Sequence, residues 1–301
     1  MKILLLGKDG QVGWELQRAL ALLGELRACG RTEADLGEPA ALRALVRAYA
    51  PDVIVNAAAY TAVDRAESDA PAAHACNALA PGVLAEEAAA AGAWLVHYST
   101  DYVFDGTKQG AWTERDAANP LSVYGRTKYE GEERIRASGA RHLILRTSWV
   151  YALRGSNFAK TVLRLAKQDE VLDVVSDQHG APTGAQLLAD ATALALQRIA
   201  LAGAGADALA GTYHLAASGA TTWHAYARHV LAQALAHGAR LRAGPEAVRP
   251  ITSDAFAAPA ARPANSLLDC GKFCTNFGLA LPDWRHHVNR LIAELAAQGN
   301  L

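Results

Sequence analysis

The first half of the chain alternates short apolar runs with longer stretches in which apolar residues recur every three or four positions. The apolar runs cover residues 2–6, 26–29, 53–55, 94–98 and 143–145, and a long alanine-rich stretch typical of a helix covers residues 70–91. Short apolar runs predict buried strands, and the stretches between them predict helices. Strands that alternate with helices form right-handed βαβ units. We therefore predict an α/β fold built on a doubly wound parallel sheet of the Rossmann type.

A glycine loop follows the first predicted strand and opens the first predicted helix. It reads Gly7-Lys8-Asp9-Gly10-Gln11-Val12-Gly13. Gly7 permits the tight turn, Gly10 lets the backbone approach a pyrophosphate, and Gly13 lets the helix pack closely on the strand. Free N–H groups and the positive dipole end at the helix start favour phosphate. The loop predicts a dinucleotide site, although its spacing is G-x-x-G-x-x-G and a plain strand-to-helix connection is the alternative.

Tyr124 and Lys128 form a Tyr-x-x-x-Lys pair about a hundred residues after this loop. Residues four apart share one face of a helix, so the ammonium would favour the ionised form of the phenol. Such a phenol is a general acid for the oxygen that forms when a dinucleotide gives hydride to a ketone. Such a pair can also occur by chance, so it indicates a reductase only in combination with the glycine loop before it.

Composition and charge narrow the range of partners. The 301-residue chain has a formal charge of −1 and no basic run, so we expect no nucleic acid and no anionic membrane as partner. The opening apolar run is far shorter than a signal or transmembrane segment, which predicts a cytoplasmic protein. Four scattered cysteines offer neither a disulfide framework nor a metal-ligand set.

The alternation of predicted strands and helices becomes less regular after residue 149. Helices are predicted over residues 155–167, 186–199 and 222–237, and residues 249–263 form a proline-containing loop that could cover a site. We predict that residues 1–150 form an NAD(P)-binding domain. Residues 151–301 would form mainly a smaller, mixed α/β substrate-binding lobe, with parts of 184–236 packing back on the first domain.

Several separate segments resemble a known family. The glycine loop, the Tyr124/Lys128 pair and Ser-Thr-Asp-Tyr-Val-Phe at 99–104 resemble extended short-chain dehydrogenases/reductases. Residues 7–16, 56–64, 146–151, 157–161 and 177–184 are similar, more narrowly, to the dTDP-4-dehydrorhamnose reductase family. The resemblance covers nearly the whole chain. It implies reduction of the C4 ketone of dTDP-4-dehydro-6-deoxy-L-mannose with NADPH or NADH, which gives dTDP-L-rhamnose for polysaccharide biosynthesis.

The resemblance also implies roles for individual residues. Tyr124 would donate the proton, Lys128 would bind the nicotinamide ribose, and Thr100 would polarise the carbonyl, with an ordinary turn cap as the alternative for Thr100. Trp149 would contact substrate, unless it is a core residue. The cofactor-binding residues would be Gly7, Asp9, Gly10, Gln11, Val12, Gly13, Arg31, Asp35, Leu36, Ala57, Ala58, Ala59, Ser99, Tyr124 and Lys128. The substrate-binding residues would be Thr61, Thr100, Asp101, Tyr102 and Trp149.

The residues after the second predicted strand bear on the choice of cofactor. Cys29-Gly30-Arg31-Thr32 offers an arginine for a 2′-phosphate and no immediate carboxylate for a free ribose, which favours NADPH and leaves NADH as the second choice. Arg31 as a plain surface charge is the alternative interpretation.

Some family members form a dimer around magnesium held by glutamates. Glu15 and Glu294 match such positions, but Gln186 stands where those members have a glutamate, and an amide is a weaker ligand for magnesium. We therefore expect no bound metal, and a homodimer stays open. Two other functions also stay open: a related sugar-nucleotide epimerase or dehydratase, and a non-catalytic regulatory subunit on the same fold.

Overall fold

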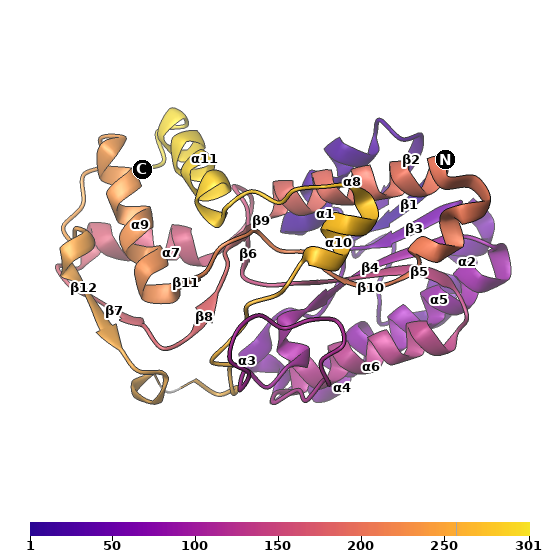
Figure 1. The fold of residues 1–301 in the computed structure, drawn as a ribbon, viewed down its shortest axis with the longest axis horizontal. Helices are drawn as coiled ribbons and strands as arrows, with labels where there is room; N and C mark the ends of the chain where they lie inside the picture. Colours follow the sequence, from indigo (N-terminus) through magenta and orange to yellow (C-terminus); the bar gives the residue numbers. More distant parts are fainter. Residues whose placement is uncertain (257) are drawn as a thin grey trace.

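A six-stranded parallel sheet forms the centre of the larger lobe in the computed structural model, which describes residues 1–256 and 258–301 (Figure 1). The strand order is β10-β5-β4-β3-β1-β2, and every pair is parallel. The strands are β1 (Lys2–Leu6), β2 (Glu25–Cys29), β3 (Val53–Asn56), β4 (Trp94–Thr100), β5 (Arg141–Thr147) and β10 (Gly211–His214). The predicted α/β fold is confirmed, and β10 is a strand that the sequence pattern did not reveal.

Helices cover both faces of this sheet because alternate residues of each strand point to opposite sides. Ile3 and Leu5 of β1 pack into a core with helices on one face, whereas Leu4 and Leu6 pack into a second core on the other face. The first face carries α1 (Gln11–Leu20) and α8 (Ala185–Ala202), and the second carries α2 (Pro39–Tyr49), α5 (Ala80–Ala91) and α6 (Val123–Ala137). The sheet is therefore doubly wound.

The stretch predicted as one helix over residues 70–91 is divided in the structure. It consists of α4 (Ala70–His74), a π-helical turn (Ala75–Leu79) and α5. The π turn contains Asn77, a buried side chain whose amide bonds to both main-chain groups of Tyr60 at 2.9 and 3.0 Å. This amide ties the helix to the loop that follows β3.

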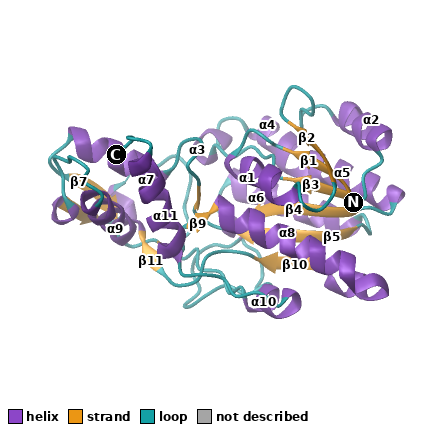
Figure 2. Ribbon diagram, turned by 90° about the horizontal axis from the view of Figure 1, so that it is seen from above, coloured by secondary structure: helices purple, strands orange, loops and turns teal. Residues whose placement is uncertain are grey.

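The smaller lobe has its own apolar core and lies beside the carboxyl edge of the sheet (Figure 2). Its helices are α7 (Phe158–Gln168), α9 (Trp223–Ala236) and α11 (Trp284–Ala297), packed with the parallel pair β7 (Leu172–Val175) and β12 (Val248–Ile251). Residues 249–263, which were predicted to form a loop, thus begin within strand β12. The domain boundary at residue 150 stays a prediction.

Short elements complete the described chain. The strands are β6 (Val150–Tyr151), β8 (His179–Gly180), β9 (Thr183–Gly184) and β11 (Thr221–Thr222), and the helices are α3 (Val63–Ala66) and α10 (Gly271–Phe277). Turns of 3₁₀ helix cover Asp101–Val103, Gly203–Leu209, Pro245–Ala247 and Ser253–Ala255.

The segment Ala185–Leu209, which contains α8, is long and apolar enough to cross a membrane by length and composition alone. Leu188, Ala195 and Leu196 of this segment are buried in the core that joins α8 to the sheet. The apolar character of α8 is therefore explained by its place in the fold.

Candidate active site

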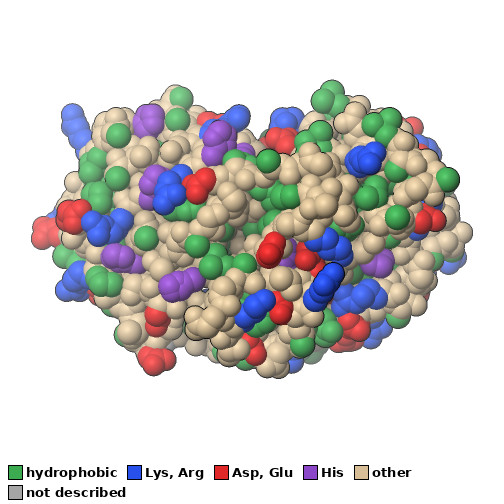
Figure 3. Space-filling model, viewed as in Figure 1, with side chains coloured by type: hydrophobic (Ala, Val, Ile, Leu, Met, Phe, Trp, Pro, Cys, Tyr) green, Lys and Arg blue, Asp and Glu red, His purple; other side chains and the backbone are tan. Residues whose placement is uncertain are grey.

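The residues predicted to bind and to react follow the carboxyl ends of the sheet strands. Gly7 follows β1, Arg31 lies just beyond β2, Ala57 follows β3, Thr100 ends β4, and Trp149 lies just beyond β5. Parallel strands place their carboxyl ends at one edge, which is where open α/β sheets bind their ligands. In Figure 3 the surface is indented between the two lobes that meet beside this edge. The candidate site is therefore formed by residues from separate parts of the sequence.

Two positions of the glycine loop admit no side chain. Gly7 has φ +86°, and a Cβ there would lie 2.7 Å from the main-chain nitrogen of Ala58. A Cβ on Gly13 would lie 1.9 Å from the main-chain oxygen of Gly7, so α1 sits directly on the loop. A Cβ on Gly10 would meet only that same oxygen, at 3.4 Å, and no side chain caps α1 there. An uncapped helix start behind an open glycine fits a phosphate group.

The loop also contacts a segment of the second half of the chain. Nε of Arg154 donates to the main-chain oxygen of Asp9 at 3.1 Å, and the amide of Asn157 lies 3.4 Å from Oε1 of Gln11. Val12 packs against the core between α1 and the sheet. Asp9, Gln11 and Val12 thus hold the loop in place, and their contacts to a cofactor stay predictions.

A carboxylate that follows Cys29–Thr32 in the sequence lies beside the end of β2. The Glu33 side chain turns back to accept the N–H of Gly30 at 2.8 Å and pairs with Lys8. These bonds, that of Lys8 first, lower the pKa of Glu33 to about 2. Cys29–Thr32 itself carries no carboxylate, as the sequence indicated, but Glu33, four positions after Cys29, folds back onto the turn and places one there.

Arg31, Asp35 and Leu36 have different surroundings. The Arg31 side chain is 87% exposed and pairs with Asp35 at 3.2 Å. The Asp35 carboxylate also accepts the N–H of Gly37 at 2.9 Å. Leu36 is buried in the core on one face of the sheet. Arg31 is thus exposed at the strand end and paired with Asp35, whereas Leu36 supports the fold.

Tyr124 lies in the first turn of α6, which begins at the capping residue Ser122. Burial raises the pKa of the Tyr124 phenol to about 12, and the nearby Thr100 hydroxyl acts in the opposite direction. The ring of Tyr102 packs edge-on against that of Tyr124, with centroids 5.5 Å apart. A phenol with this pKa is protonated at neutral pH, as a proton donor must be.

Lys128 lies one turn after Tyr124, but its ammonium group bonds elsewhere. Nζ donates to the main-chain oxygen of Tyr98 at 2.6 Å and lies 3.1 Å from Nε2 of His97. Burial lowers the pKa of Lys128 to about 8. The expected lowering of the Tyr124 pKa by Lys128 is not seen in this structure: burial raises this pKa, and Nζ of Lys128 bonds to β4.

Thr100 combines two local roles at the end of β4. Its hydroxyl lies 3.1 Å from Oδ1 of Asp101 and accepts the N–H of Tyr102 at 3.1 Å. The turn-cap interpretation of Thr100 thus describes a bond that the structure contains. Asp101 is buried beside it, and burial raises its pKa to about 6. Its Oδ2 has no hydrogen-bond partner among the described residues.

The remaining predicted residues lie around this centre. Ser99 is buried on β4 and donates to Glu132. Thr61 is exposed in the loop after β3. Trp149 has φ +48° and stacks on Trp223, with ring centroids 3.6 Å apart. Trp149 is only half-buried, so it is not a fully buried core tryptophan, and its contact with substrate stays a prediction.

Comparison with known proteins decides the family. A family model described as the RmlD substrate binding domain matches residues 1–297. The chain is 52% identical to a dTDP-4-dehydrorhamnose reductase of Escherichia coli K12 and 50% identical to one of Salmonella typhimurium, with 98% of each chain covered. The chain belongs to the dTDP-4-dehydrorhamnose reductase family. The resemblance that the sequence motifs indicated is confirmed.

Solved structures of dTDP-4-dehydrorhamnose reductases have the same fold. The chain matches one from Clostridium acetobutylicum with a TM-score of 0.86 and 33% identity over 98% of this chain and 99% of the other. It matches one from Bacillus anthracis, which is in complex with NADP, with a TM-score of 0.85 and 31% identity over 98% and 100%. As a member of this family, the chain is an NAD(P)H-dependent oxidoreductase.

The two glutamates that the family resemblance suggested as magnesium ligands lie beside arginines in the structure. Glu15 lies 3.5 Å from Arg18, and Glu294 pairs with Arg290 at 2.9 Å. Gln186 and Glu294 line one small cavity. Across residues 1–256 and 258–301, no group of three His, Cys, Asp or Glu side chains could hold a metal ion.

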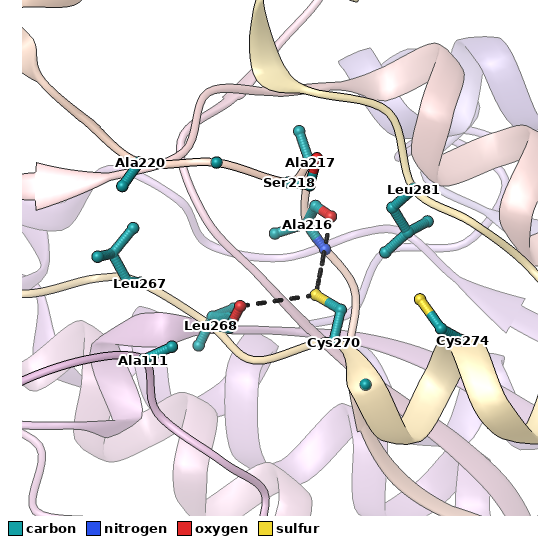
Figure 4. A pocket seen from close by; sticks show the side chains of 12 residues that line it. Ala111, Ala216, Ala217, Ser218, Ala220, Leu267, Leu268, Cys270, Cys274 and Leu281 are labelled. Atoms are coloured by element: carbon teal, nitrogen blue, oxygen red, sulfur yellow. Dashed lines mark hydrogen bonds between the residues drawn. The ribbon is translucent and has the colours of Figure 1, made fainter.

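A separate cavity of about 380 Å³ lies beyond the edge strand β10 (Figure 4). Ala216, Leu267 and Leu281 line it together with Cys270 and Cys274. Sγ of Cys270 accepts the N–H of Ala216 at 3.3 Å, and burial raises the pKa of this thiol to about 12. None of the residues predicted for the reductase site lines this cavity.

Proposed function

We propose that the chain reduces the C4 ketone of dTDP-4-dehydro-6-deoxy-L-mannose (dTDP-4-dehydrorhamnose) with NADPH. The product is dTDP-L-rhamnose, and the reaction is the last step of dTDP-rhamnose biosynthesis. The observation that carries this proposal is the placement of Thr100, at the end of β4, and Tyr124, whose ring packs against that of Tyr102, at the same sheet edge as the open glycine loop.

The residues of the chain have distinct tasks in this reaction. NADPH supplies a hydride to the ketone carbon when it is bound. Tyr124 gives its phenolic proton to O4, where negative charge develops, and Thr100 donates a hydrogen bond to the same oxygen after its hydroxyl turns from Asp101. One donor placed at such an oxygen is worth about 2.7–4 kcal/mol. Hydride and proton together convert the ketone to the alcohol.

The binding residues follow from their positions. The main chain around Gly10 would hold the pyrophosphate, the small side chains 57–59 would line the dinucleotide, and Arg31 would pair with the 2′-phosphate. Thr61, Asp101, Tyr102 and Trp149 would contact the dTDP-sugar. In this assignment residues 1–150 bind the cofactor and residues 151–301 bind mainly the sugar nucleotide. The prediction of a cytoplasmic enzyme and the open question of a homodimer belong to the same proposal.

One assay tests the proposed activity. NADPH oxidation is measured with enzymatically generated dTDP-4-dehydro-6-deoxy-L-mannose and, in parallel, with UDP- and GDP-linked ketosugars. The proposal expects one NADPH oxidised per sugar reduced, with the dTDP-linked substrate strongly preferred. An epimerase or dehydratase would recycle its nicotinamide and consume none. A regulatory subunit would turn over none of these sugars, so either result would overturn the proposal.

A further inference from the structure

Two indole rings from separate parts of the fold stack on one another beside the candidate site. Trp149 lies just beyond β5 of the large sheet, and Trp223 is the first residue of α9 in the smaller lobe (Figure 1). Their ring centroids lie 3.6 Å apart, and the two planes are inclined by 15°. Both side chains are half-buried. The reaction described above assigns a substrate contact to Trp149 and no task to Trp223.

The main chain at Trp149 has a conformation that a tryptophan rarely adopts. Its φ of +48° lies in the left-handed region, where a Cβ crowds the carbonyl oxygen that follows it. The main-chain oxygen of Trp149 accepts the N–H of Thr183 at 3.1 Å. Such a conformation costs free energy, so it persists only where the surrounding contacts hold it. The neighbours of Trp149 therefore decide where its indole lies.

One of these neighbours is Gly180 of β8. A Cβ on Gly180 would lie 2.5 Å from Cε2 of Trp149 and 2.6 Å from Cζ2. Real Cβ atoms do not approach other atoms so closely, so a larger residue at position 180 would displace the indole. A glycine inside a strand often marks such a close approach. This glycine belongs to the segment 177–184 that the family resemblance includes.

A directed chain of hydrogen bonds holds the Trp223 indole. Its Nε1–H donates to Oε1 of Gln178 at 3.1 Å. An indole nitrogen can only donate, so the amide oxygen of Gln178 faces Trp223 and the NH₂ group faces Ser253. Nε2 of Gln178 donates to Oγ of Ser253 at 3.0 Å, and this hydroxyl donates to Oδ1 of Asp177 at 2.7 Å. The chain fixes the orientation of the Trp223 ring.

Apolar contacts hold the same ring from the side of the smaller lobe. The centroid of Phe158, the first residue of α7, lies 4.6 Å from that of Trp223, and the centroid of Tyr226 lies 6.2 Å away. Trp223 packs against the core of this lobe, to which Tyr226 belongs. Trp223 is therefore a fixed surface on which Trp149 rests.

We propose that Trp223 is a positioning residue, whose ring holds the Trp149 indole where it contacts the sugar nucleotide. The proposal rests on the proposed function, in which Trp149 binds the dTDP-sugar. Aromatic rings in contact attract one another beyond the area that they bury. A side chain that is already held in its binding position loses less freedom when the ligand arrives, so the ligand binds more tightly. Trp223 itself touches neither substrate nor cofactor in this assignment.

The kinetic test is a double-mutant cycle on the two tryptophans. Trp223→Leu should raise the KM for the dTDP-linked ketosugar about 2- to 10-fold, the usual worth of an aromatic pair, and leave the KM for NADPH unchanged. In a Trp149→Leu background the same substitution should change the KM little, because no indole is left to position. Equal rises in the two backgrounds, or an unchanged KM in Trp223→Leu, would overturn the proposal.

Gly180→Ala displaces the same indole and leaves the hydrogen bonds of Trp223 in place. It should raise the KM for the ketosugar, and this rise should also disappear in the Trp149→Leu background. Val230→Ala, about two turns further along α9, is the control for a loss of packing, since Val230 is buried in the core of the smaller lobe. It should leave the KM unchanged. A rise as large as that of Trp223→Leu would overturn the proposal.

A spectroscopic test needs no substrate. Two stacked indoles couple their electronic transitions and give a couplet in the far-ultraviolet circular dichroism spectrum. The proposal expects this couplet in the unsubstituted protein, its loss in Trp223→Leu and a weaker couplet in Gly180→Ala. An unsubstituted protein without a couplet, or a couplet that survives Trp223→Leu, would overturn the proposal. Absence of turnover in the unsubstituted protein would instead overturn the proposed function, so the two failures are distinguishable.

Discussion

Oγ of Ser99 donates a hydrogen bond of 2.6 Å to Oε1 of Glu132, and both side chains are buried. Glu132 also accepts two bonds from the Arg146 guanidinium, at 2.8 and 2.6 Å. Burial alone would raise the pKa of Glu132, but the bonds to Arg146 and Ser99 bring it below its ordinary value. A buried ion pair thus connects α6, which carries Tyr124 and Lys128, to strands β4 and β5.

We predict that Glu132→Gln lowers the free energy of unfolding by about 3–5 kcal/mol, because Arg146 is then left buried without a counter-charge. Urea denaturation measures this change. Glu133→Gln on the same helix is the control, since Glu133 is 54% exposed and its pair with Arg136 should be worth about 0–1 kcal/mol. Equal losses in the two variants would contradict this account of the pair.

The same pair makes stability depend on pH. The pKa of Glu132 is lower in the folded protein than its ordinary value of 4.5. The unfolded chain therefore binds the proton more readily, so the contribution of Glu132 is fully present above pH 4.5 and is lost as the pH falls through the folded value. Glu132→Gln should flatten this part of the stability profile. An unchanged acid dependence would assign it to other carboxylates.

Tyr124→Phe should lower turnover by about 10²–10⁴-fold, the usual contribution of a positioned general acid. The cofactor should still bind, since the ring and its contact with Tyr102 remain. Steady-state kinetics and NADPH titration measure the two effects. Tyr129→Phe, on the same helix and outside the predicted site, should change neither. Near-normal turnover in Tyr124→Phe would remove the phenol from the mechanism.

Arg31→Ala should raise the KM for NADPH and leave the KM for NADH nearly unchanged, because only NADPH carries the 2′-phosphate. The side chain is 87% exposed, so its removal should not disturb the fold. Initial rates with each cofactor measure the effect, and Arg198→Ala on the exposed side of α8 is the control. Equal losses with both cofactors would mean that Arg31 acts through the structure of the turn.

Treatment with EDTA should leave activity and molecular mass essentially unchanged. Gln186 offers only a neutral amide, a weak ligand for magnesium, and Glu15 and Glu294 lie beside Arg18 and Arg290. Size-exclusion chromatography with light scattering measures the mass before and after chelation. A dimer that dissociates in EDTA and forms again with magnesium would show that the remaining carboxylates are sufficient.

The sequence predicted the parts of the fold that depend on local pattern. Residues 2–6 and 53–55 are short apolar runs, and the sheet buries the side chains of such runs on both faces. Strand β10 has only four residues, Gly211–His214, two of which are polar, and it joins the edge of the sheet after a long α8. Its pairing with β5 is a tertiary contact that no local pattern records.

The residues of the candidate site also divide into those that a local sequence motif reveals and those that only tertiary contacts reveal. The glycine loop and the Tyr124/Lys128 pair are spacing motifs, so they could be found in the sequence. Glu33 was missed because its carboxylate folds back across a turn to Gly30. Trp223 was missed because it lies near the start of a predicted helix without a motif, and only the assembled fold stacks its ring on Trp149. Contacts between distant segments decide these roles.

The most direct test of the proposed reaction follows the hydride itself. NADPH carrying deuterium at its reactive C4 position is incubated with the enzyme and dTDP-4-dehydro-6-deoxy-L-mannose, and the product is analysed by NMR and mass spectrometry. Direct transfer, with Tyr124 as proton donor, predicts deuterium at C4 of the rhamnosyl product and one NADPH oxidised per sugar. Deuterium at another carbon, or product formed without net oxidation of NADPH, would contradict the account.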